Sequence, residues 1–592
     1  MRWHRGAAGP AGPGALRPRL RAVTAVWALG VIAAFAAYLR LARTRAVNSD
    51  GAGNALQAWD MLHGNVLLRG WSLSDVSFYT TELPQYMLVE AWRGLNADVV
   101  HVAAAMTYTL VMLLAALLAR GNSAGREALV RVLITAGIML APQLGSGVNI
   151  LISSPDHIGT SVPVMVVWLI VDRARPRWYV PVLAGALLGW AQVADMLVLY
   201  IGVLPLVLVS AIRAGRAVAA GRPLASQRYD MALGTAALAA AAAAVLALRI
   251  IHAFGGFSAP APATQFVHGG TALAGNLGVT AEGLLLLGGA DFLGLRPGAG
   301  AVFTVLHVAG VVLAAWGTGL AARRFLRDGD RVVQLLVTGV AVNLALYVLS
   351  DMAYTLTQTR EIAAVLPFSA ALAGRLLAGR FKAARLAPLL LVVLLGYLAG
   401  LAREITQPPA AAQDQQLTSW LAARHLHAGL SGYWESNVVT LTSGDRVRIR
   451  AVAVYGGGLH PGIRELKQQW YDPARDTADF VVLFPGVAGY PGFTQERAVL
   501  AAFGNPARTY HVGSYTVLVW NRNLLVKLAG ASAGDTRGPP ARVLGTRDER
   551  PERPALICGR ARDARRAVTG GLTSFRHDLP RTGEGPWMFP RS

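Results

Sequence analysis

A polar stretch near the start of the chain holds the first residues that could perform chemistry. Residues 48–84 follow an apolar segment and contain four carboxylates, two tryptophans and one histidine. A carboxylate just outside a bilayer can act as a general base that takes a proton from an acceptor hydroxyl, and Asp50 is placed for this role. Taken alone, Asp50 is better explained by a solvated Asx turn before Gly51. Asp50 is therefore either a general base or a residue of a turn.

Glu82 is the second carboxylate of interest in this stretch. It precedes Pro84, and acidic residues and proline are both favoured in the first turn of a helix, so Glu82 could mark a helix start. It could equally be a second catalytic carboxylate, a substrate-binding residue or a metal ligand. Asp60 and Asp75 are predicted to be structural. The apolar spacing of residues 54–62 predicts an amphipathic helix at the membrane surface that roofs a lipid-accessible cavity.

The pair Asp156-His157 opens a later apolar segment. Asp156 is placed to cap the N-terminus of a helix. An Asp-His pair at the end of a membrane helix could also bind substrate, ligate a metal or take part in acid–base chemistry. The spacing alone defines no Mg²⁺, Mn²⁺ or Zn²⁺ site, so a divalent cation stays an open alternative. Asp195 is expected in a turn, because a carboxylate at bilayer depth would cost about 2.5–3.5 kcal/mol.

Arg360 is the single residue whose position most strongly indicates a binding role. It is the one basic residue of the segment 351–360, directly before Glu361 and an apolar helix that contains Pro367. A cation at a helix N-terminus opposes the helix dipole, so this position needs a reason. A phosphate supplies one, because the guanidinium and the helix N–H groups would both face the anion. A salt bridge to a nearby carboxylate or a lipid headgroup is the structural alternative, and we favour phosphate.

The rest of the sequence describes the scaffold that must position these residues. The chain has 592 residues, 54% of them hydrophobic and only 15% charged, and long apolar runs recur from Ala22 to Ala402. That charge fraction is well below the roughly 25% of soluble proteins, so we predict a polytopic α-helical membrane protein. The net charge of +22 comes from short arginine clusters between apolar runs, as topology signals do, and we expect no nucleic-acid partner. The single cysteine, Cys558, excludes an intrachain disulfide.

About eleven transmembrane helices are expected between residues 21 and 402. Alternate short loops are rich in arginine and are predicted to face the cytoplasm together with the N-terminus; Arg40, Arg43 and Arg45 are an exception. This orientation places the first loop (40–98), the second long loop (254–300) and the segment after residue 402 on the external face. The expected helices are 21–39, 99–119, 128–144, 157–171, 179–193, 197–212, 229–253, 301–321, 331–350, 361–377 and 386–401.

Residues 403–527 change character and predict a small extracytoplasmic α/β domain. A hairpin is expected with strands at residues 437–441 and 447–454 around the turn 442–445, and a second hairpin is expected around Gly513. A buried strand is expected at residues 479–484. Residues 494–503 predict a helix that ends at Gly504. Residues 1–20 and 528–592 are rich in arginine, glycine and proline, and both ends are predicted to be disordered.

The arrangement resembles the GT-C superfamily of polyprenyl-phosphate-dependent glycosyltransferases, which includes protein O-mannosyltransferases and aminoarabinose transferases. The resemblance rests on Asp50 early in the first external loop, amphipathic helices in that loop, an arginine that begins a late helix ahead of a proline (Arg360 and Pro367), and an external C-terminal domain. It covers most of the chain, mainly as architecture. It implies that Asp50 is the catalytic base and that Arg360 holds the lipid phosphate.

The sequence departs from the family pattern at two positions. The usual Asp-Glu or Asp-x-Asp doublet is absent at residues 48–52, and Arg360 is followed by Glu361 where tyrosine is common. These departures leave the subfamily and the metal requirement open.

The resemblance implies a multi-pass enzyme of the plasma membrane. Such an enzyme would move a hexose or pentose from a polyprenyl-phosphate donor to a glycan, lipid or protein acceptor by displacement at the anomeric carbon. A transporter or flippase of a lipid-linked or small solute is the second hypothesis, although it would require charged residues along the helices. A non-catalytic membrane assembly protein is the third.

Overall fold

The computed structural model describes residues 13–140, 147–153, 157–260, 264–293, 299–327, 329–381, 387–410, 414–455, 458–462, 464–484 and 495–528. Most of the two termini predicted to be disordered therefore lies outside the described residues. The first helix, α1 (Pro13–Ala42), begins before the expected start at residue 21 and ends after the expected end at residue 39.

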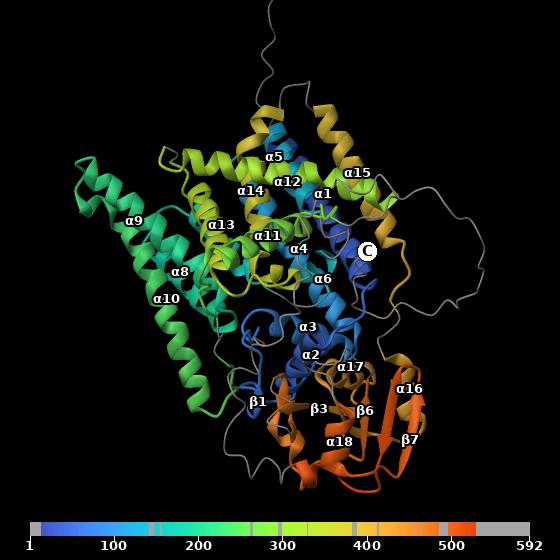
Figure 1. The fold of residues 1–592 in the computed structure, drawn as a ribbon. Coiled ribbons are helices and arrows are strands. Elements are labelled where there is room, and N and C mark those ends of the chain that lie inside the picture. The colour runs from blue at the N-terminus through green and yellow to red at the C-terminus, as the bar shows by residue number, and fades with distance from the viewer. Residues whose placement is uncertain are drawn as a thin grey trace, which may run out of the picture.

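A bundle of apolar helices forms the upper part of the molecule in Figure 1. The described residues contain eight helices that are long and apolar enough to cross a membrane, or nine if the bent pair η4–α14 is one span, so the predicted number of eleven is not confirmed. The helices after α1 in this part are α4 (Asp98–Arg120), α5 (Gly125–Met139), α6 (Gly147–Leu151), α7 (Ser161–Arg173), α8 (Tyr179–Ala194), η2 (Leu199–Val203), α9 (Leu204–Ala219), η3 (Leu224–Gln227), α10 (Arg228–Ala253), α11 (Gly270–Leu287), α12 (Ala299–Arg324), α13 (Arg331–Leu349), η4 (Leu356–Ile362), α14 (Val365–Phe381) and α15 (Ala387–Ile405).

Helix α11 lies within residues 254–300, which were predicted as one long loop. Its sequence contains four glycines, and each glycine disfavours a helix by about 1 kcal/mol relative to alanine. Tertiary contacts offset this cost. The Asn276 side chain donates to the carbonyls of Val348 and Ser350 at 2.8 and 2.7 Å, which fixes α11 against the end of α13.

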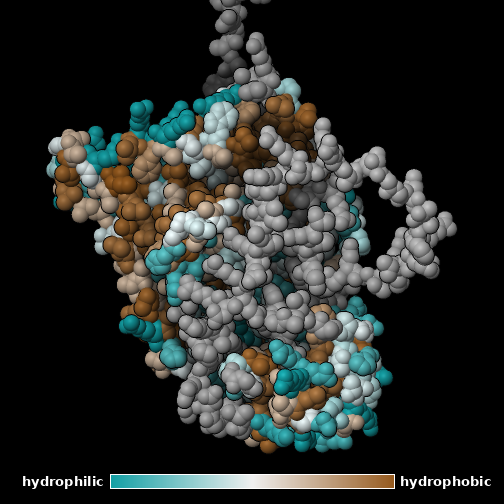
Figure 2. Space-filling view, viewed as in Figure 1, coloured by the Kyte–Doolittle hydropathy of each residue, from teal (hydrophilic) through white to brown (hydrophobic). Residues whose placement is uncertain are grey.

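The surface of the bundle has the pattern of a membrane protein. Figure 2 shows hydrophobic side chains over the side of the molecule where α8, α9 and α10 lie in Figure 1, with hydrophilic side chains at the rim above and on the C-terminal domain below. Large apolar side chains on this side are exposed, among them Trp190, Leu246 and Ile250. Helices that contact lipid expose apolar side chains in this way.

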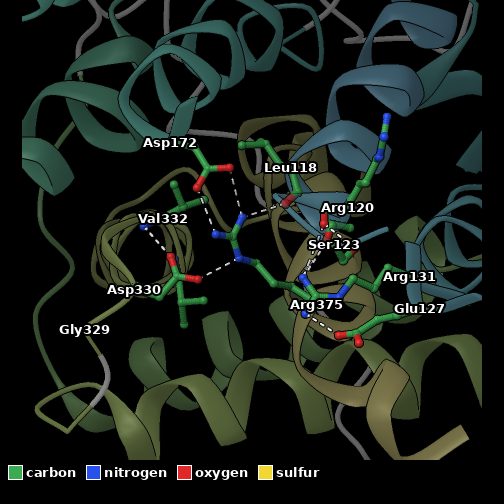
Figure 3. A network of polar contacts seen from close by, with 12 residues as sticks. Leu118, Arg120, Ser123, Glu127, Arg131, Asp172, Gly329, Asp330, Val332 and Arg375 are labelled. Atoms are coloured by element: carbon green, nitrogen blue, oxygen red, sulfur yellow. Dashed lines mark hydrogen bonds and ion pairs between the residues drawn. The ribbon is translucent and has the colours of Figure 1, made fainter. Parts of the chain in front are cut away.

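The ends of three helices meet at Arg375 of α14 (Figure 3). Its guanidinium lies 2.7 Å from Asp330 Oδ2 and 2.9 Å from Asp172 Oδ1, and it donates to the carbonyl of Leu118 at 2.8 Å. These partners belong to the C-terminal ends of α4 and α7 and to the N-cap of α13. This is the end of the bundle that carries the arginine-rich loops.

Two of the three exceptional arginines, Arg40 and Arg43, have local partners. Arg43 makes two hydrogen bonds to Asp98 at 2.8 and 2.7 Å, and Arg93 makes a third at 2.6 Å. Arg40 donates to the carbonyl of Ile405 at 3.1 Å. Because these cations are held by groups of the protein, they carry less weight as topology signals.

The C-terminal domain is the predicted α/β unit, with a six-stranded mixed sheet in the order β4-β3-β2-β6-β8-β7. Strand β2 pairs in parallel with both β3 and β6, and the other pairings are antiparallel. The elements are α16 (Gln415–Ala423), β2 (Ala428–Ser431), α17 (Tyr433–Thr442), β3 (Arg448–Tyr455), β4 (Gly458–Pro461), β5 (Leu466–Lys467), η5 (Gln468–Tyr471), β6 (Phe480–Leu483), α18 (Glu496–Phe503), β7 (Arg508–Val512) and β8 (Tyr515–Val519).

One of the two predicted hairpins is wrong. Residues 437–441, which were predicted to form its first strand, belong to helix α17. Their β-branched side chains favour a strand, but the helix buries two faces: Val439 packs against the sheet, whereas Val438 and Leu441 pack against the first loop. The second hairpin, β7–β8, forms as predicted around Gly513, whose φ is +60°.

The first loop docks on the C-terminal domain. It contains α2 (Ser49–Leu62), β1 (Trp71–Ser72) and α3 (Glu82–Arg93), and β1 pairs antiparallel with β5. Asp60 joins the two parts, because its Oδ2 accepts from Trp71 Nε1 at 2.7 Å and lies 3.0 Å from Lys467 Nζ. The predicted helix at residues 54–62 is thus the second half of α2. Most of α2 is buried in the protein, so it is a packed element rather than a roof that lies in lipid.

Candidate functional site

Asp50 lies in the first turn of α2, where the helix dipole favours a carboxylate. The cap of this helix is Asn48, whose side chain accepts from the backbone N–H of Gly51 at 2.9 Å. The Asx-type contact expected before Gly51 is therefore made by Asn48. Asp50 is left for other partners.

The partners of Asp50 come from the C-terminal domain. The hydroxyl of Tyr433, the first residue of α17, hydrogen-bonds Asp50 Oδ1 and lies 2.7 Å from Glu465 Oε2. The neighbouring Ser49 donates to the Tyr433 carbonyl at 2.5 Å. Burial, together with the negative charge of Asp50, raises the pKa of Glu465 well above its usual range. This first group of residues lies where α2 packs on α17.

Glu82 lies at the start of α3, as predicted for a helix-start residue, but it points into the protein and is 1% exposed. Its carboxylate packs directly on Gly159, where a Cβ atom would overlap Oε1. Thr81 hydrogen-bonds Oε2, whereas Oε1 is buried without a hydrogen-bond partner. Burial raises the pKa of Glu82 to about 8, and the charge of Asp195 adds to the shift. Glu82 is therefore neutral at pH 7.

His157 joins Glu82 in a second group of polar residues. Its Nδ1 lies 2.8 Å from Asp195 Oδ2 and its Nε2 lies 3.1 Å from Glu361 Oε1. Burial alone would lower the pKa of His157, but the charges of Glu361 and Asp195 raise it well above its usual value. The imidazole is therefore cationic. Thr160 also hydrogen-bonds Asp195, so His157 and Thr160 together hold this carboxylate in place.

Asp195 is more deeply buried than the sequence predicted. It was expected to be a residue of an external turn, and it does terminate α8 as the C-cap. It is nevertheless only 2% exposed, and it accepts from the backbone N–H of Leu197 at 2.8 Å in addition to its contact with His157. Burial would raise the pKa of Asp195, but His157 and Thr160 outweigh burial and lower it.

Arg360 lies in the short 3₁₀ helix η4 rather than at the start of an α-helix. Helix α14 begins at Val365 and is bent by 55° from η4. The Arg360 side chain is 31% exposed, and its Nε lies 3.8 Å from Glu361 Oε1. The contact with a nearby carboxylate, which was the structural alternative to a phosphate ligand, is thus present.

The structure brings Glu82, His157 and Arg360 into one group. Glu82 packs on Gly159, close to His157, and Glu361 contacts both His157 and Arg360. Asp50 lies in a neighbouring group. Tyr86 lies on the same face of α3 as Glu82, and its hydroxyl is within electrostatic reach of both Glu82 and Glu465. Burial raises the pKa of Tyr86 well above its usual value. Asp156 lies outside the described residues.

Four contributing residues were not predicted from the sequence. Glu361 could have been suspected from its position beside Arg360. The burial of Asp195 and the roles of Tyr433 and Glu465 depend on contacts between distant segments, which no local pattern reveals. Among the described residues, no group of three or more His, Cys, Asp or Glu side chains could hold a metal ion.

The helical bundle, the buried first loop and the C-terminal α/β domain together define the fold of a multi-pass membrane protein. No family model and no curated protein matches the chain. Two crystal structures of ArnT from Cupriavidus metallidurans do match it. The apo structure has a TM-score of 0.51 at 13% identity, over 84% of this chain and 98% of that one. The structure bound to undecaprenyl phosphate has a TM-score of 0.51 at 12% identity, over 83% and 97%.

Proposed function

We propose that the chain is a membrane glycosyltransferase that moves a hexose or pentose from a polyprenyl-phosphate donor to an extracytoplasmic acceptor. The observation that carries the proposal is the grouping of Glu82, His157 and Arg360 at one end of the bundle, beside the loop that presents Asp50. The shared fold with ArnT, which has been crystallised with undecaprenyl phosphate, supports a lipid-phosphate ligand.

Arg360 is the residue that would hold the donor phosphate. Its guanidinium is partly exposed, and Glu361 bridges it to the cationic His157. A guanidinium presents its N–H groups in a fork that matches two phosphate oxygens. Glu82, which is neutral at pH 7, would add a hydroxyl donor from its buried carboxyl group, because a protonated carboxyl can donate to an anion.

Asp50 would act as the general base. The acceptor hydroxyl transfers its proton to the Asp50 carboxylate while its oxygen bonds to the anomeric carbon of the sugar. The bond between that carbon and the phosphate oxygen breaks, and its electron pair leaves with the polyprenyl phosphate. Arg360 stabilises the negative charge that develops on this leaving group.

The proposal is tested with the purified chain in detergent. The donors are radiolabelled undecaprenyl-phosphate mannose, glucose and 4-amino-4-deoxyarabinose, and cell-envelope extract of the source organism provides the acceptor. We expect wild-type protein to transfer label from one donor, and Asp50→Asn and Arg360→Ala to reduce transfer about 100-fold or more. Arg360→Ala should also weaken binding of undecaprenyl phosphate, whereas Asp50→Asn should not.

Matched controls are available for both residues. Arg380→Ala changes an arginine of α14 at the other end of the bundle. Asp445→Asn changes a half-exposed aspartate of the C-terminal domain, whose φ of +64° asparagine tolerates. Both controls should transfer label at the wild-type rate. Normal transfer by Asp50→Asn or Arg360→Ala would refute the assigned roles, and transfer from none of the three donors would count against this donor class.

A further inference from the structure

We infer that the C-terminal domain completes the active site, and that Tyr433 and Glu465 are positioning residues that fix Asp50 in the orientation of a general base. This inference rests on the proposed function, because it takes Asp50 as the base. It assigns a role to a domain whose fold alone suggests none.

The geometry places three oxygen-bearing groups in a row. The hydroxyl of Tyr433 contacts Asp50 Oδ1 on one side and Glu465 Oε2, at 2.7 Å, on the other. Tyr433 is 9% exposed and Glu465 is 3% exposed. Ser49 ties α2 to α17 beside this row, because its hydroxyl donates to the Tyr433 carbonyl at 2.5 Å.

A proton count sets the direction of the two hydrogen bonds. A tyrosine hydroxyl has one proton to donate, so it cannot donate to two ionised carboxylates. One carboxyl group must carry a proton of its own. Glu465 is the buried one, and burial raises its pKa well above the usual range. Glu465 therefore donates to the Tyr433 oxygen, and Tyr433 donates to ionised Asp50.

This direction has a consequence for the reaction. The bond from Tyr433 occupies Asp50 Oδ1 and holds the carboxylate in one rotamer. Oδ2 is then the oxygen that receives the proton of the acceptor hydroxyl.

Glu465 is fixed tightly in this position. Its φ of +53° is uncommon for a residue with a side chain. Its carboxyl group packs on Gly53 of α2 so closely that a Cβ atom there would overlap Oε2, and its carbonyl accepts from Asn437 Nδ2 at 3.3 Å. Gly53 lies inside a helix and faces a carboxyl group from another domain, so an added Cβ atom would require that carboxyl group to shift.

Other charged and titratable groups surround the row. The Arg464 guanidinium lies 5.0 Å from the centre of the Tyr433 ring. Asp75 of the first loop acts on both Arg464 and Glu465, and Tyr86 of α3 is within reach of the charge of Glu465. Arg464 offsets the negative charge of Asp50, which lets one carboxylate stay ionised beside a neutral one.

Tyr433→Phe is the first test, because it removes one hydroxyl and keeps the ring. With the donor that wild-type protein uses, we expect kcat to fall at least about tenfold with KM for the donor unchanged. Loss of a hydrogen bond that holds the base in its rotamer affects the chemical step and not donor binding. Tyr471→Phe is the matched control: it also removes a buried hydroxyl of this domain, bonded to the Ala451 carbonyl at 2.5 Å, and should leave kcat unchanged.

Glu465→Gln tests the proton on Glu465. We expect kcat to fall, but by less than in Tyr433→Phe, because an amide N–H can replace the carboxyl O–H as donor to the Tyr433 oxygen. A second measurement does not depend on activity. The infrared difference spectrum between wild-type protein and Glu465→Gln at pH 7 should contain the C=O band of a protonated carboxylic acid, and Tyr433→Phe should shift that band.

The outcomes separate this inference from the proposed function. Full activity of Asp50→Asn would refute the base itself. Loss of activity in Asp50→Asn with wild-type kinetics in Tyr433→Phe would refute only the role of the C-terminal domain. Carboxylate bands in place of an acid band in the infrared difference would overturn the direction of the two hydrogen bonds, whatever the activity.

Discussion

The hydroxyl of Tyr433 hydrogen-bonds Asp50, a residue 383 positions earlier in the chain, and lies 2.7 Å from Glu465. The contact joins the start of α2 to the start of α17, so the first loop and the C-terminal domain form one packed unit. The β1–β5 pairing and the ion pair between Asp60 and Lys467 join the same two parts near the other end of α2. The position of Asp50 therefore depends on how the domain docks.

Gly53→Ala should disturb this docking. A Cβ atom at residue 53 would overlap the Glu465 carboxyl group, so the carboxyl must move away from Tyr433. We expect transfer activity to fall about tenfold or more, although alanine favours a helix by about 1 kcal/mol over glycine. Gly278→Ala in α11 is the control, because nothing lies within 4 Å of that Cβ position. Equal activity of the two variants would show that the contact at Gly53 has no effect on the site.

Glu82 should make the stability of the protein fall as the pH rises. Its pKa is raised to about 8 by burial, so the folded state binds a proton that the unfolded state releases near pH 4.5. The stabilising effect of this proton is complete below that pH and is lost as the pH rises through about 8, at about 1.4 kcal/mol per pH unit. Thermal denaturation in detergent between pH 5 and 9 should show a shallower decline for Glu82→Gln than for wild-type protein. Parallel curves would contradict a neutral Glu82.

Asp195→Asn should destabilise the fold and impair the site together. It removes a charge that pairs with the buried cation of His157, which also contacts Glu361. Breaking a buried pair in this way costs about 3–5 kcal/mol. The thermal denaturation midpoint in detergent should fall clearly, whereas Asp445→Asn, which alters a half-exposed pair, should change it little. A midpoint as high as that of the control would show that the pair contributes no stability.

The sequence predicted the membrane architecture better than the details of the site. Apolar length and arginine clusters are local signals, and they identified most helices and predicted that Glu82, His157 and Arg360 lie at the end of the bundle away from the basic loops. Helix α11 was missed because its glycines mask a helix that tertiary packing stabilises. Helix α17 was mistaken for a strand because its β-branched residues pack on two sides. The pairing of Asp50 with Tyr433 joins residues that only the folded chain brings together, so no spacing rule could reveal it.

Arg375 provides a test that separates stability from function. Its guanidinium binds Asp172 and Asp330 and the Leu118 carbonyl at the end of the bundle away from the candidate site (Figure 3). Arg375→Ala leaves the buried Asp172 without its cation, and we expect a loss of about 3–5 kcal/mol. Arg375→Lys should lose less, because an ammonium group keeps the charge but cannot reproduce the fork that reaches both carboxylates.

The matched control for Arg375 is Arg380→Ala, on the same helix. Arg380 lies over the ring of Trp316, with 5.1 Å from its guanidinium carbon to the ring centre, and an exposed contact of this kind is worth roughly 0.5–1 kcal/mol. Thermal denaturation in detergent should therefore rank the variants Arg380→Ala, Arg375→Lys and Arg375→Ala in order of falling midpoint. At a temperature where all remain folded, each should bind undecaprenyl phosphate as wild-type protein does, because the phosphate is expected at Arg360. A specific loss of binding in folded Arg375→Ala would instead place the anion at this end of the bundle.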